Sequence, residues 1–133
     1  MHVVYLLDSN ICIAIINRNP QAIAEFNNKV GYCCVATIAI AELYKGVYCS
    51  GKIERNLNTL NEFLAMVTVV PFDSAAAEEF GKIQGELRSI GRPTGDLDAL
   101  IAAVARSRGD TVVTHNVRDF SNISGLELED WLR

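Results

Sequence analysis

The segment "VVYLLDSN", residues 3–10, sets the fold of this chain. Its first five residues, 3–7, form an uninterrupted apolar run, as expected for a strand that is buried on both faces of a sheet. Asp8 follows at once, with the polar Ser9 and Asn10 behind it. A carboxylate in this position is either the N-cap of a following helix or a functional group at the end of the strand.

Similar apolar runs occupy residues 33–37, 67–70 and 111–114, and a weaker alternating segment covers 126–130. Helical patterns fill the intervals between them. Strands that alternate with helices predict an α/β fold, in three α/β/α layers, with a central parallel sheet of four to five strands. In such sheets ligands bind beyond the carboxyl ends of the strands, which is where Asp8 is expected to lie.

The length of 133 residues predicts one domain, residues 1–133. No apolar run approaches the roughly 20 residues of a membrane span, and the N-terminus does not show the pattern of a secretory signal. We therefore expect a soluble, cytoplasmic protein without a membrane segment. The cysteines show no metal-binding spacing and are expected to be buried, reduced thiols; they are Cys12, Cys33, Cys34 and Cys49.

The net charge of −4 argues against a domain that holds nucleic acid by bulk electrostatics. It leaves open an enzyme that acts on nucleic acid through metal ions. Arginines are concentrated in the C-terminal half, and Arg92 and Arg118 lie closest to acidic motifs. These two are the candidates for phosphate contacts.

Glu42 lies within "TIAIAELYKG", residues 37–46, where apolar residues surround it. A helix with this pattern is expected to be largely buried, so a carboxylate in its middle requires compensation. Lys45, three residues further on, offers a salt bridge. A bound cation is the other possibility.

Two more acids lie in "GRPTGDLDALIAAVARSRG", residues 91–109. Asp96 and Asp98 are about 200° apart around a helix and cannot face the same point. Asp96 suits an N-cap, whereas Asp98 shares a stripe with small and apolar residues that is expected to face the sheet. Asp119, in "THNVRDF", follows the 111–114 strand. It is either a functional acid at the end of that strand or a solvated residue of the loop.

Four carboxylates that converge on one sheet edge repel one another unless a cation neutralises them. Oxygen ligands without a convergent cysteine or histidine cluster suit Mg²⁺ or Mn²⁺. We expect Asp8 and Asp98 to bind the metal directly. Glu42 and Asp119 are expected to bind it directly or through water.

At these residues the chain resembles a PIN-domain ribonuclease, specifically a VapC-type toxin of the bacterial type II toxin–antitoxin systems. The resemblance covers nearly the whole chain through "LLDSNICI", "ATIAIAELYKGV", "GRPTGDLDALIAAVARSRG", "VVTHNVRDF" and "SGLELEDWL". It implies that the acidic quartet of the family is Asp8, Glu42, Asp98 and Asp119. Ser9 stands where the family more often has threonine, and Asn116 matches a polar residue; both are expected to hydrogen-bond around the metal site. Asp96 matches no acidic family position, so it either extends the metal site or caps the helix.

The resemblance further implies hydrolysis of structured RNA to 5′-phosphate and 3′-hydroxyl ends, with tRNA cut in the anticodon region. It also implies a homodimer and a cognate VapB-type antitoxin. We expect a helix of the antitoxin to dock over residues 9–17 and 38–65, with one of its basic side chains reaching the carboxylates. The apolar residues expected at that surface are Ile11, Ile15, Ile16, Tyr44, Val47 and Tyr48.

Two alternatives belong to other classes of protein. A receiver-like phospho-acceptor domain also clusters acids at strand ends, but it needs an acid pair after the first strand and a lysine beyond the last. Here Asp8 is single, and no lysine follows Lys82. A non-catalytic PIN-fold binding module is the other alternative, and the four intact acids argue against it.

Overall fold

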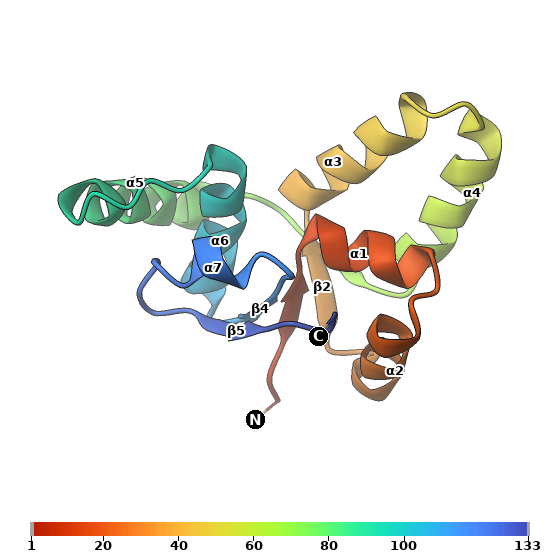
Figure 1. Cartoon of the computed structure of the whole chain (residues 1–133), viewed down its shortest axis with the longest axis horizontal. Helices are drawn as coiled ribbons and strands as arrows, with labels where there is room; N and C mark the ends of the chain where they lie inside the picture. The colour runs from red at the N-terminus through yellow and green to blue at the C-terminus, as the bar shows by residue number, and fades with distance from the viewer. Residues whose placement is uncertain (1, 133) are drawn as a thin grey trace.

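The computed structural model describes residues 2–132 and shows a sheet with helices on both sides (Figure 1). The strands coincide with the predicted apolar runs, shortened by one or two residues, and the weak C-terminal segment also forms a strand. In chain order the elements are β1 (Tyr5–Leu7), α1 (Ser9–Ile16), α2 (Pro20–Lys29), β2 (Cys33–Ala36), α3 (Thr37–Tyr48), α4 (Ile53–Leu64), β3 (Thr68–Val70), α5 (Ser74–Ser89), α6 (Asp96–Arg108), β4 (Thr111–Val113), α7 (Val117–Phe120) and β5 (Glu127–Glu129).

The sheet has five strands in the order β3-β2-β1-β4-β5, and every neighbouring pair is parallel. The chain builds outward from β1 to β3 and then returns to place β4 on the other side of β1. Because parallel crossovers are right-handed, this reversal puts α1 to α4 on one face and α5 to α7 on the other, as Figure 1 shows. The predicted α/β/α layering with a parallel sheet is confirmed. The switch in direction lies between β1 and β4, where parallel sheets form their ligand crevices.

The core is formed by the central strands and by the face of α6 that lies against them. Leu6 and Leu7 of β1 and Val112 and Val113 of β4 are fully buried. Five consecutive residues of α6, from Ile101 to Ala105, are also buried, so its small side chains let the helix lie close to the sheet.

Helix α3 differs from the prediction. It was expected to be largely buried, but only one face is buried; Tyr44 and Tyr48, expected at the docking surface, are exposed. The apolar pattern of this segment therefore predicts more burial than helix α3 has.

Helix ends follow the local sequence with one exception. Asp8 caps α1 and Asp73 caps α5 by accepting hydrogen bonds from backbone amides of the first turn. Gly109 ends α6 with a φ of +78°, a left-handed conformation that favours glycine. The predicted N-cap at Asp96 is wrong. Gly95 occupies the cap, and Asp96 is the first helical residue, exposed and bonded to Gln84.

The cysteines are unpaired, as predicted, but not all of them are buried. Cys12, Cys33 and Cys34 lie in the core, whereas Cys49 is exposed at the C-cap of α3. Among residues 2–132, no helix has the length and apolar character needed to cross a membrane.

Candidate active site

Asp8 lies at the switch point of the sheet, between the end of β1 and the start of α1. Its backbone amide donates to the carbonyl of Val113 (2.9 Å), which ties it to the end of β4. Its carboxylate accepts from the Ser9 amide and from the Thr114 hydroxyl, both at 2.8 Å, and the residue is only 4% exposed. Burial raises the pKa of Asp8, the hydrogen bonds from Thr114 and Ser9 oppose this shift, and the charge of Glu42 adds to it.

Glu42 reaches the same place from α3. The Ser9 hydroxyl donates to its carboxylate at 3.0 Å, so Ser9 connects Glu42 to Asp8. The alternative salt bridge is not formed, because within residues 2–132 no ion pair joins Glu42 to Lys45. Glu42 is therefore held by a neutral hydroxyl.

A second pair of carboxylates is held by Asn116. Its side-chain amide donates to Asp98 of α6 (2.8 Å) and to Asp119 of α7 (2.9 Å). Asp98 is half-buried and Asp119 is exposed. Burial raises the pKa of Asp98, and the charges of Asp8 and Asp119 raise it further against the hydrogen bond from Asn116.

The two pairs form one network. The Asn116 backbone amide donates to the Thr114 hydroxyl (2.9 Å), which in turn donates to Asp8. The structure thus brings together all four acids predicted from the sequence, and also the two polar residues Ser9 and Asn116. Every side chain that hydrogen-bonds to these acids within residues 2–132 is neutral.

This donor set fits a hydrated Mg²⁺ or Mn²⁺. Within residues 2–132, no three His, Cys, Asp or Glu side chains stand close enough to enclose a metal ion by themselves. Mg²⁺ in proteins commonly binds one or two carboxylates and keeps several waters, so it needs no such enclosure. Burial raises the pKa of Asp8 and Asp98, and the charges of neighbouring carboxylates add to this, so a bound cation would favour the ionised form of both.

The sequence reasoning missed two polar groups at this edge. Thr114 is fully buried, and its hydroxyl donates a hydrogen bond to Asp8. The sequence feature that could have indicated this role is a hydroxyl residue at the end of a buried strand. His115 is 59% exposed in its side chain, and its Nδ1 lies 3.1 and 3.3 Å from the carboxylate oxygens of Asp130. This pair joins residues from the ends of β4 and β5, which no local pattern could show.

Some of the arginines form salt bridges with acidic side chains and others do not. Arg106 bonds to Glu79 and Glu86, and Arg108 bonds to Asp110, so these two serve the fold. Arg92 and Arg118, the predicted phosphate contacts, are exposed and form no salt bridge within residues 2–132.

The apolar surface predicted around α1 and α3 is only partly exposed. Ile11, Ile15 and Val47 are buried in the core, so the prediction was wrong for these three residues. A cavity of about 380 Å³ between α1, α3 and α4 is lined by Ile16, Val47 and Glu42, among others. Ile13, which also lines the cavity, is exposed, and Tyr44 and Tyr48 are exposed elsewhere on α3.

Comparison with known proteins agrees with this site. The sequence matches the family described as PIN domain over residues 5–126. It is 41% identical to the tRNA(fMet)-specific endonuclease VapC of Shigella flexneri over 128 residues, which is 96% of this chain and 97% of that protein. It is 39% identical to ribonuclease VapC2 of Haemophilus influenzae over 129 residues, covering 96% and 98%. PIN-domain nucleases generally use a divalent metal.

Solved structures give the same result. The DNA-bound VapBC structure from Salmonella typhimurium has a TM-score of 0.93 and 37% identity, covering 98% of this chain and 99% of that chain. VapBC2 from Rickettsia felis, bound to a fragment of its promoter, has a TM-score of 0.91 and 32% identity, covering 97% and 99%. The acidic network therefore lies in a chain that belongs to the PIN-domain family and, within it, to the VapC ribonucleases, the toxins of toxin–antitoxin systems.

Proposed function

We propose that this ribonuclease is a Mg²⁺- or Mn²⁺-dependent endonuclease that cuts tRNA in the cytoplasm. Asp8, Glu42, Asp98 and Asp119 are its metal-binding and catalytic acids. The observation that carries the proposal is the network in which four carboxylates meet at the switch point and are held only by neutral donors.

The acids have different tasks in this proposal. Asp8 and Asp98 bind the metal directly, and Glu42 and Asp119 bind it directly or through water. A bound divalent ion supplies Lewis acidity, which makes a water nucleophilic and stabilises charge on the phosphate and on the leaving oxygen. Glu42, which Ser9 links to Asp8, orients that water.

Three neutral side chains keep the acids in place. Ser9 sets the separation of Asp8 from Glu42, and Asn116 that of Asp98 from Asp119. Thr114 links the two pairs and keeps the buried carboxylate of Asp8 hydrogen-bonded. Polar partners of this kind orient metal ligands and sustain their affinity.

The substrate proposal rests on chemistry and on a relative. The relative from Shigella flexneri, at 41% identity, is described as specific for tRNA(fMet). We take initiator tRNA as the first substrate to test, with cleavage in its anticodon loop, where unpaired bases are accessible. Arg92 and Arg118 are the proposed phosphate contacts, since they are exposed and free of salt bridges within residues 2–132.

The proposed partner is a VapB-type antitoxin, because the similar structures from Salmonella and Rickettsia are VapBC complexes. The cavity between α1, α3 and α4 suits an amphipathic helix with apolar anchors. Glu42 lines this cavity and also belongs to the acid network, so a basic residue of the antitoxin could reach the carboxylates from there. A toxin homodimer is part of the same proposal.

The function is tested by incubating the purified protein with initiator tRNA in Mg²⁺, in Mn²⁺ and in EDTA. We expect cleavage with either metal and none in EDTA, and sequencing of the 5′ ends should show one dominant cut in the anticodon loop. Cleavage that persists in EDTA would refute metal dependence. Scattered cuts, or intact tRNA beside another cleaved RNA, would refute the substrate.

The partner is tested by co-expression with the small reading frame next to the toxin gene. We expect a stable complex and relief of growth arrest. An Ile13→Asp variant should lose the complex, because it places a charge at the apolar rim of the cavity. Ile90→Asp, which alters an exposed isoleucine after α5, is the matched control.

A further inference from the structure

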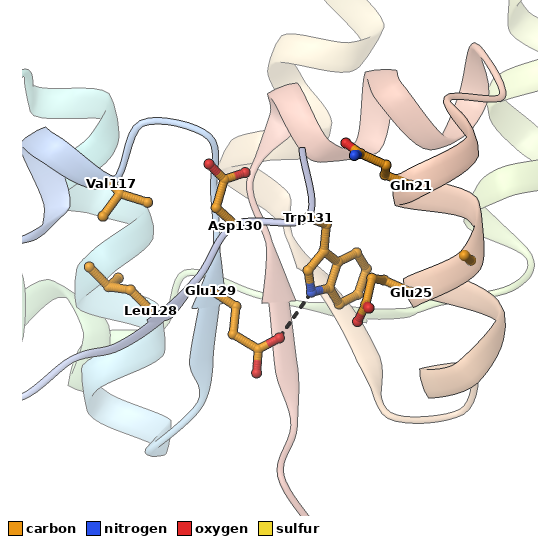
Figure 2. Close-up of a pocket in the computed structure, with 8 residues that line it drawn as sticks. Gln21, Glu25, Val117, Leu128, Glu129, Asp130 and Trp131 are labelled. Carbon is orange, nitrogen blue, oxygen red and sulfur yellow. Dashed lines mark hydrogen bonds between the residues drawn. The ribbon is translucent and has the colours of Figure 1, made fainter. Parts of the chain in front are cut away.

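A second hollow lies beside the acid network, between the end of β5 and α2 (Figure 2). Its volume is about 640 Å³, large enough for a nucleoside. Gln21 and Glu25 line it from α2, and Leu128 and Glu129 from β5. The indole of Trp131, only 4% exposed, points toward α2 and forms part of the inner wall.

Two residues on the wall of this hollow adjoin the network of the active site. Val117, on its wall, follows Asn116, which holds Asp98 and Asp119. Asp130, also on its wall, holds the His115 ring. Through Val117 and Asp130 the hollow adjoins the residues that surround the carboxylates.

The acids of the hollow all have partners. Glu25 pairs with Lys29, and Glu129 accepts a hydrogen bond from the Trp131 indole (3.0 Å; Figure 2). Asp130 accepts from the Leu132 amide at 2.8 Å in addition to holding His115. Within residues 2–132, the hollow therefore offers no unpaired carboxylate to bind a cation, and the negative charge of its acids would repel a phosphate.

The remaining properties suit a neutral, flat group that carries N–H donors. Carboxylate oxygens keep lone pairs that can accept from such donors, and the Gln21 amide both donates and accepts. Val117, Leu128 and Ala24 supply apolar walls. Nucleobases have this chemistry, and single-stranded RNA is recognised by bases that leave the stack.

We propose that this hollow is a base-binding subsite, which receives one unpaired nucleobase of the RNA next to the scissile phosphate. The proposal rests on the proposed ribonuclease function and extends it to substrate selection. Trp131 and Leu128 contact the base, Gln21 reads its polar edge, and His115 stands between base and cut site.

The test combines one variant with modified substrates. Ala24→Phe fills the hollow from an exposed position of α2, and Ala77→Phe makes the same change on an exposed position of α5 as a control. The substrate is the anticodon stem–loop of initiator tRNA, with each loop base in turn replaced by an abasic site. Melting temperatures of both variants check that they fold.

For the wild-type enzyme we expect one abasic position to lower kcat/KM by about 10-fold, in line with the loss of one stacked base. Ala24→Phe should lower kcat/KM on the intact loop by a similar factor. The same abasic position should then cause no further loss in this variant. Ala77→Phe should behave as the wild type with every substrate.

Binding can also be followed without cleavage, because Trp131 is the only tryptophan of the chain. In EDTA, the stem–loop should change the fluorescence of Trp131, and neither the abasic loop nor Ala24→Phe should give this change. If Ala24→Phe cleaves and binds as the wild type does, the subsite is refuted while the ribonuclease function stands.

Two further outcomes would also overturn the proposal. Loss of the antitoxin complex in Ala24→Phe, with RNA cleavage intact, would make the hollow a protein-docking site. A wild-type enzyme that cuts no RNA in Mg²⁺ would remove the ribonuclease function and the subsite together.

Discussion

The two carboxylate pairs of the active site are built in different ways. Asp8 and Glu42 are joined by Ser9 where α1 begins, and Asp8 is buried and tied by its backbone to β4. Asp98 and Asp119 are joined by Asn116 and lie on helices, half-buried and exposed respectively.

The difference indicates that the two carboxylate pairs have different roles. Asp8 lies where the sheet meets its first helix, so its position is fixed by the fold itself, and Glu42 reaches it from α3 through Ser9. The outer pair depends on one amide and on the four-residue α7, so it can adjust when metal and RNA bind. Breaking each pair in turn should separate these roles.

The largest effects are expected from Asp8→Asn and Asp98→Asn. Each removes a charge that the metal needs, and we expect each to lower kcat/KM by more than about 100-fold, beyond the loss typical of residues that only orient ligands. The Mg²⁺-induced rise in melting temperature should also disappear. Wild-type cleavage by either variant would remove that acid from the metal site.

The bridging residues should give smaller losses and reveal the asymmetry. Asn116→Ala and Ser9→Ala should each reduce activity by roughly 10–100-fold, as for partners that orient metal ligands. Asn116→Ala should be the worse of the two, because it frees two carboxylates, while Asp8 keeps its bonds to Thr114 and the residue 9 amide. Equal losses of activity in the two variants would argue against a difference in rigidity between the two carboxylate pairs.

Stability should depend on pH in a way that reports chiefly Asp8. A carboxyl whose pKa is raised by folding contributes stability below its ordinary value of 3.8, and this is lost as pH rises through the folded pKa. Without metal, Asp8 should therefore destabilise the protein at neutral pH, and Asp98 less so because it is more exposed.

The measurement is the difference in melting temperature between Asp8→Asn and the wild type as a function of pH in EDTA. We expect the difference to shift in favour of Asp8→Asn as pH rises from 4 toward neutrality, and Mg²⁺ to reverse it. A pH-independent difference would contradict the raised pKa.

The smallest effect is expected from Asp96→Asn. Asp96 is exposed at the start of α6 and bonds only to Gln84 among residues 2–132, 12 positions earlier. Asparagine can accept the same bond and is tolerated near helix starts, so activity and melting temperature should hardly change. A loss comparable to that of Asp98→Asn would place Asp96 in the metal site.

Much of the fold was predictable because strand periodicity and helix ends are local signals. Four apolar runs and one alternating segment predicted the five strands, and carboxylates at strand ends or within apolar helices predicted the four acids. Burial was less predictable: Ile11, Ile15 and Val47 were expected at the docking surface and proved to be core, whereas Tyr44 and Tyr48 are exposed as expected. Which face of an apolar helix meets the sheet depends on neighbours that its own sequence does not show.

The four acids were predicted, and so were Ser9 and Asn116, whereas Thr114 and His115 were not. A carboxylate among apolar residues is conspicuous, whereas a hydroxyl such as Thr114 is common after any strand. The contacts of His115 with Asp130 and of Trp131 with α2 join segments far apart in sequence. They depend on the strand order, which places β5 next to β4.

During translation, the residues that form the active site of this nuclease are synthesised in an order that delays its assembly. Asp8 is among the first residues made, but Thr114, its hydrogen-bond partner, follows 106 positions later. The first three strands and their helices can associate during translation, yet β1 gains its second neighbour only when β4 emerges. A nascent or truncated chain that ends before residue 111 has Asp8, Glu42 and Asp98 but not the strand that unites them. A chain that has not yet reached β4 therefore lacks the assembled acid network.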